Sequence, residues 1–241
     1  MALMRGVDPH PRMKQTPSLV LPAQTPTRTF TEPRWPVVVT IVAVSALVTT
    51  LPERVRVFPP WVPYILVVIV LMPMTALALT TAKSRWLRIE SAVIWLFFLT
   101  AGFGLVAQLI QVLSAMVRRS TDLSGLQLLT SSIAVWATNV LLFSIAYRRT
   151  DRGGPEARAN STSSRPDRSF PQESAPGDAP LEWRPTFIDY LFLSYCTATA
   201  FSPAEAQPLT ARAMLLLMLE SMISLITIVA IASRAINILG S

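Results

Sequence analysis

The last apolar stretch of the chain carries polar side chains at helical spacing. Starting from Glu220, intervals of four, three and seven residues lead to Ser224, Thr227 and Arg234, which places all four on one helix face. A carboxylate near the middle of a membrane helix costs ~2.5–3.5 kcal/mol on insertion scales unless it is paired or protonated. Glu220 must therefore face protein or water, and the chemistry that such a group offers is binding of a proton or a cation.

Asp189 is the other acid that lies in an apolar segment. Together with Glu220 it forms the candidate proton or cation site. The alternative is structural for both residues. Glu220 would accept hydrogen bonds from hydroxyl or backbone groups of residues 194–200, and Asp189, in the first turn of its helix, would favour the positive end of the helix dipole.

Hydroxyl side chains complete the set of candidate pore-lining or buried polar residues, and those preceding Glu220 are Ser194, Thr197 and Thr199. Serine and threonine in a helix bond a carbonyl one turn back, so helix-internal bonding is their default. In a hydrated path the same side chains would line the path together with Glu220.

The residue types of the chain offer little basis for a catalytic site or a metal site. The chain has one cysteine, Cys196, and one histidine, His10, so no His/Cys cluster for a metal can be assembled. No catalytic triad, phosphate loop or dinucleotide fingerprint is present in the sequence either. We expect no enzyme activity, no metal and no cofactor.

The elements that position these side chains are predicted from charge-free stretches. Hydrophobic residues make up 51% of the chain, whose mean hydropathy is +0.46, more than a soluble surface tolerates. Crossing a bilayer takes about 20 apolar residues, and the stretches that contain no Asp, Glu, Lys or Arg are Trp35–Pro52, Val57–Ala82, Ser91–Val117 and Leu123–Tyr147. The fold class is therefore all-α, a polytopic transmembrane bundle, with helices expected over 35–51, 62–81, 91–116 and 126–147.

The chain divides into four regions by composition. Residues 1–34 form a basic, proline-rich tail that we expect to be disordered, and 35–147 hold the four helices. Residues 83–90 are expected to make a tight basic turn between two of them. Residues 148–184 are polar and are predicted to be a disordered loop, and 185–241 form a C-terminal helical hairpin. Small residues at 102–104 suit close helix packing, and amides at Gln108, Gln111 and Asn139 are expected to bond between helices.

The C-terminal region resembles the pore domain of tetrameric potassium channels. The resemblance rests on about 52 residues, in which the matching features are a Phe-x-Asp-Tyr-Leu start at 187–191, Ser194, Thr-Ala-Thr-Ala at 197–200, Pro-Leu-Thr at 208–210, Arg212 and Glu220. In that family the part matching 189–199 is the pore helix, and it leads into a glycine-rich filter. The whole layout also looks like an uncharacterised family of bacterial polytopic membrane proteins with channel-like last segments, a likeness that implies no activity.

The filter itself is missing from the resemblance. Where the family has Gly-Tyr-Gly-Asp, this chain has Phe-Ser-Pro-Ala at 201–204. Filter carbonyls alternate because glycine reaches positive φ, whereas proline fixes φ and alanine and phenylalanine disfavour positive values. A potassium-selective filter is therefore not expected.

Positive charge orients the chain. Of 21 Lys and Arg residues, fifteen lie in 1–34, 83–90 and 148–184, and at most six lie on the opposite side. Since cytoplasmic loops are the basic ones, the N-terminus and the 148–184 loop are predicted to face the cytoplasm of a bacterial inner membrane. This bias, with net charge +7, serves orientation in a lipid bilayer and not nucleic-acid binding. It favours six crossing segments with both termini inside; the alternative is five crossings plus a re-entrant helix at 186–201.

Two functions remain open at this stage. The first is a channel-like or pore-related protein without potassium selectivity, in which Thr197, Thr199 and Glu220 line a path in a homo-oligomer. The second is a non-conducting accessory protein that recruits a protein partner through the loop at 148–184. The residues do not choose between them.

Overall fold

A computed structural model describes residues 33–79, 83–118, 124–159, 165–174, 183–199 and 206–239. The described chain is mostly helical, which confirms the all-α class. The long helices are α1 (Trp35–Thr50), α2 (Val62–Leu79), α3 (Lys83–Val117), α4 (Gly125–Thr150), α7 (Phe187–Thr199) and α8 (Ala211–Leu239). The shorter elements are a 3₁₀ turn η1 (Asp151–Gly153), α5 (Pro155–Ala159), α6 (Pro171–Ser174) and the two-residue strands β1 (Arg168–Ser169) and β2 (Gln207–Pro208), which pair antiparallel.

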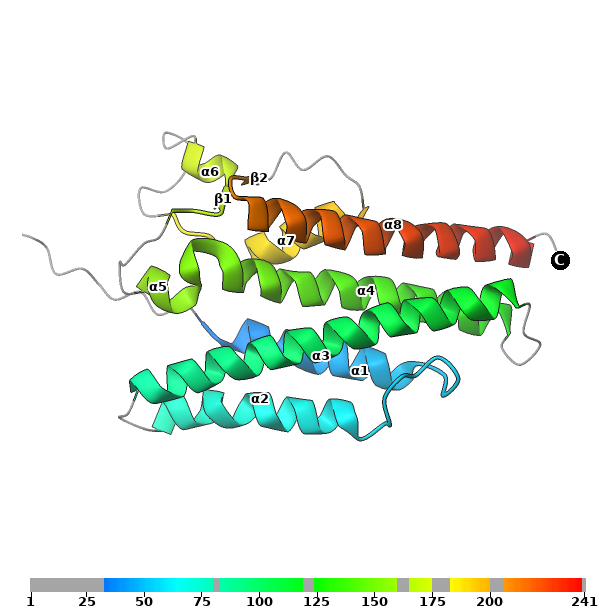
Figure 1. Ribbon diagram of the computed structural model, residues 1–241, viewed down its shortest axis with the longest axis horizontal. Coiled ribbons are helices and arrows are strands. Elements are labelled where there is room, and N and C mark those ends of the chain that lie inside the picture. The colour runs from blue at the N-terminus through cyan, green and yellow to red at the C-terminus, as the bar shows by residue number, and fades with distance from the viewer. Residues whose placement is uncertain are drawn as a thin grey trace, which may run out of the picture.

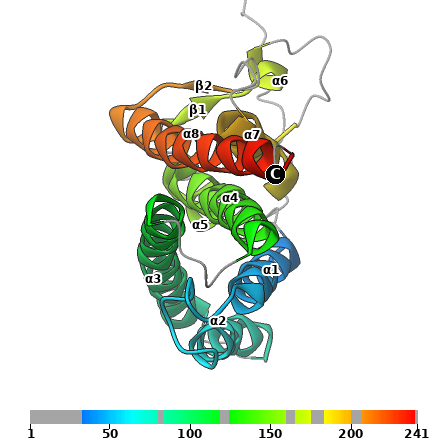
Figure 2. The ribbon, with the colours of Figure 1, turned by 90° about the vertical axis from the view of Figure 1, so that its right-hand side faces the viewer.

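The long helices lie side by side around α4 (Figure 1). Seen along the bundle, α7 and α8 cover one side of α4, while α1 and α3 cover the other and α2 lies farthest away (Figure 2). Helix α4 begins with a capping box, in which Ser124 Oγ accepts from the Gln127 amide and the Gln127 side chain accepts from the Ser124 amide. Because α4 touches both sides, it is the most buried of the long helices.

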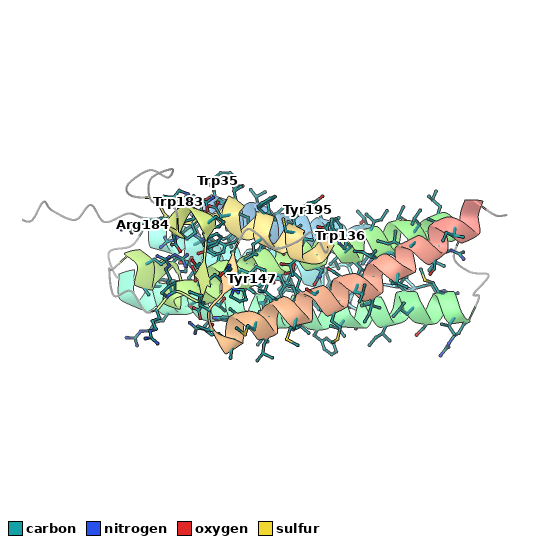
Figure 3. The ribbon with its side chains drawn as sticks, turned by 90° about the horizontal axis from the view of Figure 1, so that it is seen from above. Trp35, Trp136, Tyr147, Trp183, Arg184 and Tyr195 are labelled. Carbon is teal, nitrogen blue, oxygen red and sulfur yellow. The ribbon has the colours of Figure 1, made fainter. Side chains whose placement is uncertain are left out.

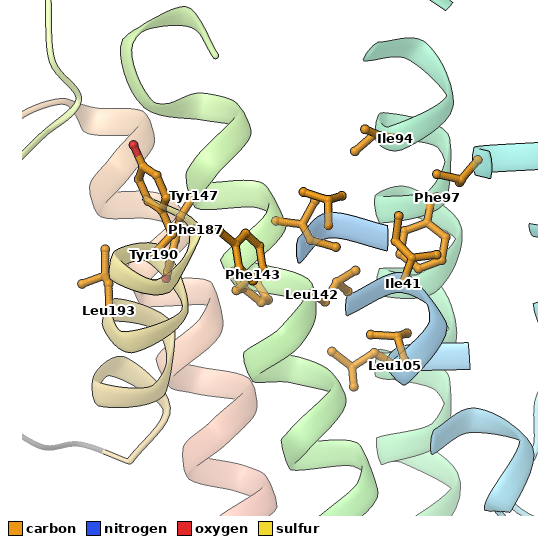
Figure 4. Packing of buried hydrophobic residues seen from close by; sticks show 14 of the residues in the cluster. Ile41, Ile94, Phe97, Leu105, Leu142, Phe143, Tyr147, Phe187, Tyr190 and Leu193 are labelled. Carbon is orange, nitrogen blue, oxygen red and sulfur yellow. The ribbon is translucent and has the colours of Figure 1, made fainter. Parts of the chain in front are cut away.

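The hydrophobic core follows from this central position. Figure 4 shows Leu142 of α4 lying toward Ile41 of α1 and Leu105 of α3, whereas Phe143 lies toward Phe187 of α7. All of these side chains are buried. Leu142 and Phe143 of α4 thus contact different sides of the bundle, which the ~100° rotation per residue of a helix allows.

Three of the described helices are long and apolar enough to cross a membrane, and they comprise Trp86–Val117, Gly125–Gly153 and Ala211–Ile236. Two further apolar helices are shorter, Trp35–Thr50 and Val62–Ala76. Large apolar side chains such as Leu99, Phe103 and Met218 are exposed on the bundle surface, which is the arrangement expected where lipid is the solvent. The fold is consistent with a membrane protein, but six crossing segments are not confirmed.

Two predicted boundaries differ from the structure. Residues 83–90, expected to form a turn, are the first turns of α3, because Trp86, Leu87 and Ile89 continue its helical pattern. The segment expected at 186–201 forms a helix of only 13 residues, α7. At 1.5 Å per residue it spans about 20 Å, against about 30 Å for a hydrocarbon core.

The predicted disordered loop at 148–184 also differs where the structure describes it. Residues 148–159, 165–174 and 183–186 pack on one end of the bundle, with Asp151, Asp167 and Arg168 fully enclosed. Phe170 contacts Tyr190 and Trp183 at ring distances of 5.6 and 5.7 Å. Composition predicted disorder because charges and prolines dominate, whereas the charges pair with one another and the aromatic residues anchor the segment.

Candidate functional site

Helix α7 begins at one end of the bundle and stops near its middle. At its start, the Tyr190 hydroxyl donates to Asp151, which directly follows α4, over 2.8 Å. Near its end, the Ala198 carbonyl accepts from the indole of Trp136, close to the middle of α4, over 3.4 Å. Helix α7 therefore runs antiparallel to α4 along only half of its length.

The chain then returns to the end from which α7 started. The described chain resumes at Ala206, and β2 pairs with β1 in the segment that follows α4. The Leu209 amide donates to the Asp167 carbonyl over 2.8 Å. Helix α8 starts beside the beginning of α7 and runs past the end of α7 to the far end of the bundle (Figure 1). We call α7, residues 206–210 and α8 the C-terminal hairpin.

Glu220 lies fully buried where α4, α7 and α8 meet. Its carboxylate is held on both sides, because Oε2 accepts from the Tyr147 hydroxyl and Oε1 contacts Ser194 Oγ. Ser194 Oγ also lies 2.7 Å from the Val140 carbonyl of α4. The contact with Ser194 is the one expected of Glu220 from residues 194–200, whereas Tyr147 of α4 was not among its expected partners.

Asn139 extends this polar layer between α4 and α8. Its amide nitrogen donates to Ser224 Oγ over 2.8 Å and to the Glu220 backbone carbonyl over 3.3 Å, as expected for an amide that bonds between helices. Asn139, Ser224 and Thr227 are buried. Thr227 bonds the Ile223 carbonyl of its own helix at 2.7 Å, which is the helix-internal default.

A second polar cluster closes the end of the bundle at which α7 and α8 begin. Asp167 is fully enclosed and accepts from the Arg212 guanidinium through both carboxylate oxygens, from Thr210 Oγ1 over 2.7 Å and from the Arg152 amide over 3.2 Å. Burial opposes the charged form of Asp167, but the hydrogen bonds from Arg212 and Thr210 outweigh it, so its pKa lies below the ordinary value.

Further ion pairs belong to the same end, which we call the basic end. Glu90 of α3 lies 3.6 Å from Arg34, just before α1, and 3.9 Å from Arg149 of α4. Trp35, Trp183 and Arg184 lie near this end, whereas Trp136 and Tyr195 lie closer to the middle (Figure 3). Tryptophans beside basic residues are typical of a membrane interface.

Arg168 connects the two polar clusters. Its guanidinium is enclosed and stacks over the Tyr147 ring, 4.4 Å from the ring centroid. It donates to the Tyr147 carbonyl and to Thr150 Oγ1, each over 3.3 Å. Tyr147 thus carries a cation on its ring and donates its hydroxyl to Glu220.

A pocket of about 460 Å³ lies beside the C-terminal half of α7. Its walls come from α7, the returning chain and α8, and its polar side chains include Thr197, Gln207 and Ser221. The last carbonyls of a helix have no partner within the helix and carry partial negative charge. The pocket is lined mainly by apolar side chains, and Thr197, Gln207, Ser221 and the C-terminal end of α7 supply its polar groups.

The remaining predicted residues have local partners. Asp189 Oδ2 accepts from the amide and the hydroxyl of Thr186, both over 2.7 Å, which caps α7. Thr197 and Thr199 bond carbonyls one turn back, at 2.8 Å each. The structure brings Ser194, Glu220 and Ser224 together, and Asp189 lies apart from them at the basic end. The Phe-Ser-Pro-Ala stretch at 201–204 lies outside the described residues.

The sequence analysis missed Tyr147, Asp151, Asp167 and Arg168 as parts of the site. A signal for two of them was present, since α4 carries Asn139, Phe143, Tyr147 and, just beyond it, Asp151 at intervals of four, which is one helix face. No such signal marks the other two, because Asp167 meets Arg212 across 45 residues of chain.

Comparison with known proteins found no matching family model, no matching curated protein and no matching solved structure.

Proposed function

We propose that this chain is an integral membrane protein related to pore-domain proteins, in which α7 is re-entrant. The C-terminal hairpin then forms one wall of a hydrated path for small monovalent cations, without potassium selectivity. One observation carries the proposal. A 13-residue helix enters from the basic end, stops beside the middle of α4, and the chain resumes at the same end. Such backbone at membrane depth is tolerated only where protein buries it or where it lines a water-filled cavity.

A path for cations also requires groups that attract cations, and the pocket at the C-terminal half of α7 supplies such groups. The C-terminal end of α7 and the hydroxyls of Thr197 and Ser221 all border this pocket. The partial negative charge at a helix C-terminus attracts cations. Only one wall of a path is present in a single chain. A homo-oligomer would supply the opposite wall, as the resemblance to tetrameric channels implies.

The orientation that we propose combines the charge count with the path of the chain. With α8 starting at the basic end, Arg212 joins the fifteen basic residues of that side, and Arg54, Arg56, Arg118, Arg119 and Arg234 remain for the other side. The difference of sixteen to five puts the basic end in the cytoplasm of a bacterial inner membrane. Helices α1, α2, α3, α4 and α8 then cross, and α7 is re-entrant from the cytoplasmic side.

Cysteine labelling tests this topology. In a Cys196→Ala background, we expect Ser163→Cys to be protected from a membrane-impermeant maleimide in intact cells and Ser241→Cys to be labelled. Protection of both positions until lysis would contradict a re-entrant α7 and would support six crossing segments. Labelling of Ser163→Cys from outside would reverse the proposed orientation.

Cation flux tests the path itself. The protein, purified and reconstituted into liposomes, is expected to conduct sodium and potassium with little preference between them. In the Cys196→Ala background, a positively charged thiosulfonate reagent should block flux through Ser221→Cys, which lines the pocket. The adjacent Met222→Cys is the matched control, because Met222 is 59% exposed on the apolar surface of α8. Absence of flux in every form would contradict the proposal and favour the accessory role.

A further inference from the structure

We infer that Glu220 carries a bound proton in the folded protein, so that the junction of α4, α7 and α8 is a buried proton-binding site. The inference is independent of the proposed cation path. It rests on the number of hydrogens available to the oxygen atoms that surround Glu220.

Ser194 contacts two acceptors but has one hydrogen to give. Its Oγ lies 2.7 Å from the Val140 carbonyl and also contacts Glu220 Oε1. A hydroxyl is one donor with two acceptor lone pairs, whereas a carbonyl can only accept. If the Ser194 hydrogen points to Val140, the contact with Glu220 needs a hydrogen from the carboxyl group itself.

A protonated Glu220 supplies a hydrogen for each contact that its carboxyl group and Ser194 make. Its Oε1–H donates to Ser194, the Ser194 hydroxyl donates to the Val140 carbonyl, and the Tyr147 hydroxyl donates to Oε2. An ionised Glu220 would take the Ser194 hydrogen and leave two oxygen atoms facing each other at 2.7 Å without one. Two oxygen atoms at this distance repel each other unless a hydrogen lies between them, because 2.7 Å is the length of an O–H···O hydrogen bond.

The charges around Glu220 agree with a neutral carboxyl group. Among the described residues, no Lys or Arg nitrogen forms a salt bridge with its carboxylate. Arg168 from β1 stacks on the Tyr147 ring and donates to carbonyl and hydroxyl oxygens instead. An unpaired ionised carboxylate in an apolar interior is far costlier than a neutral one.

The other groups that face Glu220 do not change the number of hydrogens available to its carboxyl group and to Ser194. From α4 come Tyr147 and Asn139, and the Asn139 amide nitrogen is used by Ser224 and the Glu220 backbone carbonyl. From α7 comes Ser194, while the hydroxyl of Tyr190 points to Asp151. Loss of the proton would add one negative charge at the junction and would turn the Ser194 hydroxyl away from Val140. Proton binding is therefore coupled to the bonds that hold α7 against α4.

Infrared difference spectroscopy of the full chain reconstituted in lipid tests the inference. A protonated carboxyl group has a C=O stretching band, shifted in D₂O, that a carboxylate lacks. We expect the wild type to show this band at neutral pH and Glu220→Gln to lose it. Glu90→Gln is the matched control, because Glu90 is also buried but forms ion pairs with Arg34 and Arg149, so its replacement should leave the band unchanged.

Glu220→Gln should fold, since its amide NH₂ can donate to Ser194 while its carbonyl accepts from Tyr147. If it does not, two other variants keep the inference testable. Ser194→Ala and Tyr147→Phe each remove one hydrogen bond to the carboxyl group and should shift the band. A wild type without the band, or a band that none of these variants alters, would overturn the inference, whether or not the protein conducts ions.

Discussion

The two sides of α4 are held together by different forces. On the side of α1, α2 and α3, the contacts away from the basic end are apolar, as in the packing of Leu142 against Ile41 and Leu105, and the ion pairs of Glu90 lie at that end. Even the buried amide of Gln108 has no partner for its Oε1 among the described residues. On the side of α7 and α8, hydrogen bonds and ion pairs of Glu220, Asn139 and Asp167 connect the elements.

The difference follows from the lengths of the helices. Inside a bilayer, apolar contact between helices competes with equally apolar lipid, so it gives little specificity to a helix that does not cross. Helix α7 has only 13 residues, and under the proposed topology its end would lie at membrane depth, where directed bonds would fix its place. The side of α4 that carries the polar bonds is therefore the side that holds the helix proposed not to cross.

The largest expected effect is loss of Asp167, which ties β1 to the start of α8. We expect Asp167→Ala to lower the free energy of unfolding by about 3 kcal/mol, because the bonds from Thr210 and the Arg152 amide lose their acceptor in a buried place. Arg212, whose side chain is 57% exposed, can rehydrate and limits the loss. Glu173→Ala, which removes the more exposed partner of Arg152, is the control and should cost under about 1 kcal/mol. Unfolding in mild detergent measures both; equal losses would remove the distinction.

The same carboxylate predicts an acid dependence. The pKa of Asp167 is lower in the folded protein than its ordinary value, since hydrogen bonds from Arg212 and Thr210 outweigh burial. A group of this kind stabilises the fold above its unfolded pKa of about 3.9 and loses that contribution as pH falls through the folded value. The wild type should therefore lose part of its stability below about pH 4, and Asp167→Asn should show a flatter profile. Parallel profiles would show that Asp167 is not the group responsible.

On the apolar side, close approach replaces polar bonding. A Cβ at Gly104 would lie 2.9 Å from the Phe58 ring, whereas one at Gly102 would lie 3.8 Å from Leu142. We expect Gly104→Leu to destabilise the protein by about 2 kcal/mol through overpacking, and Gly102→Ala to change stability by less than about 0.5 kcal/mol. Both can be measured by thermal unfolding. A neutral Gly104→Leu would mean that the connection carrying Phe58 moves freely.

Much of the fold could be predicted from local pattern. The charge-free stretches located α1, α2, α4 and most of α3, and α8 lies within the predicted C-terminal hairpin of 185–241. The bond between Glu220 and the 194–200 stretch and the cap by Asp189 were expected from residue type and position. In each case the information lies within one helix, where spacing decides which residues share a face.

The contacts that the sequence did not predict join segments far apart in the chain. Tyr147 meets Glu220 across 73 residues and Arg212 meets Asp167 across 45. Composition even argued against the second pair, since the polar segment around Asp167 lacks the aliphatic residues of a core. Ion pairs order this polar segment. They join residues that are close in space but far apart in the chain, so they leave no periodic signal in the sequence.

The smallest expected effect tests whether the polar layer acts as a specific bond. Asn139 and Ser224 form a buried pair at 2.8 Å between α4 and α8, and interhelical hydrogen bonds in membranes average about 0.6 kcal/mol. A double-mutant cycle of Asn139→Ala and Ser224→Ala should give a coupling energy of that size. Gln108→Ala combined with Ser224→Ala is the control on the apolar side and should show additivity, because Gln108 lines a hollow between α1, α2 and α3 with Ser45 and Thr100. A coupling near zero for the first pair would mean that α8 is held on α4 by shape alone, and the contrast between the two sides of α4 would then reduce to the contacts of Glu220 and Asp167.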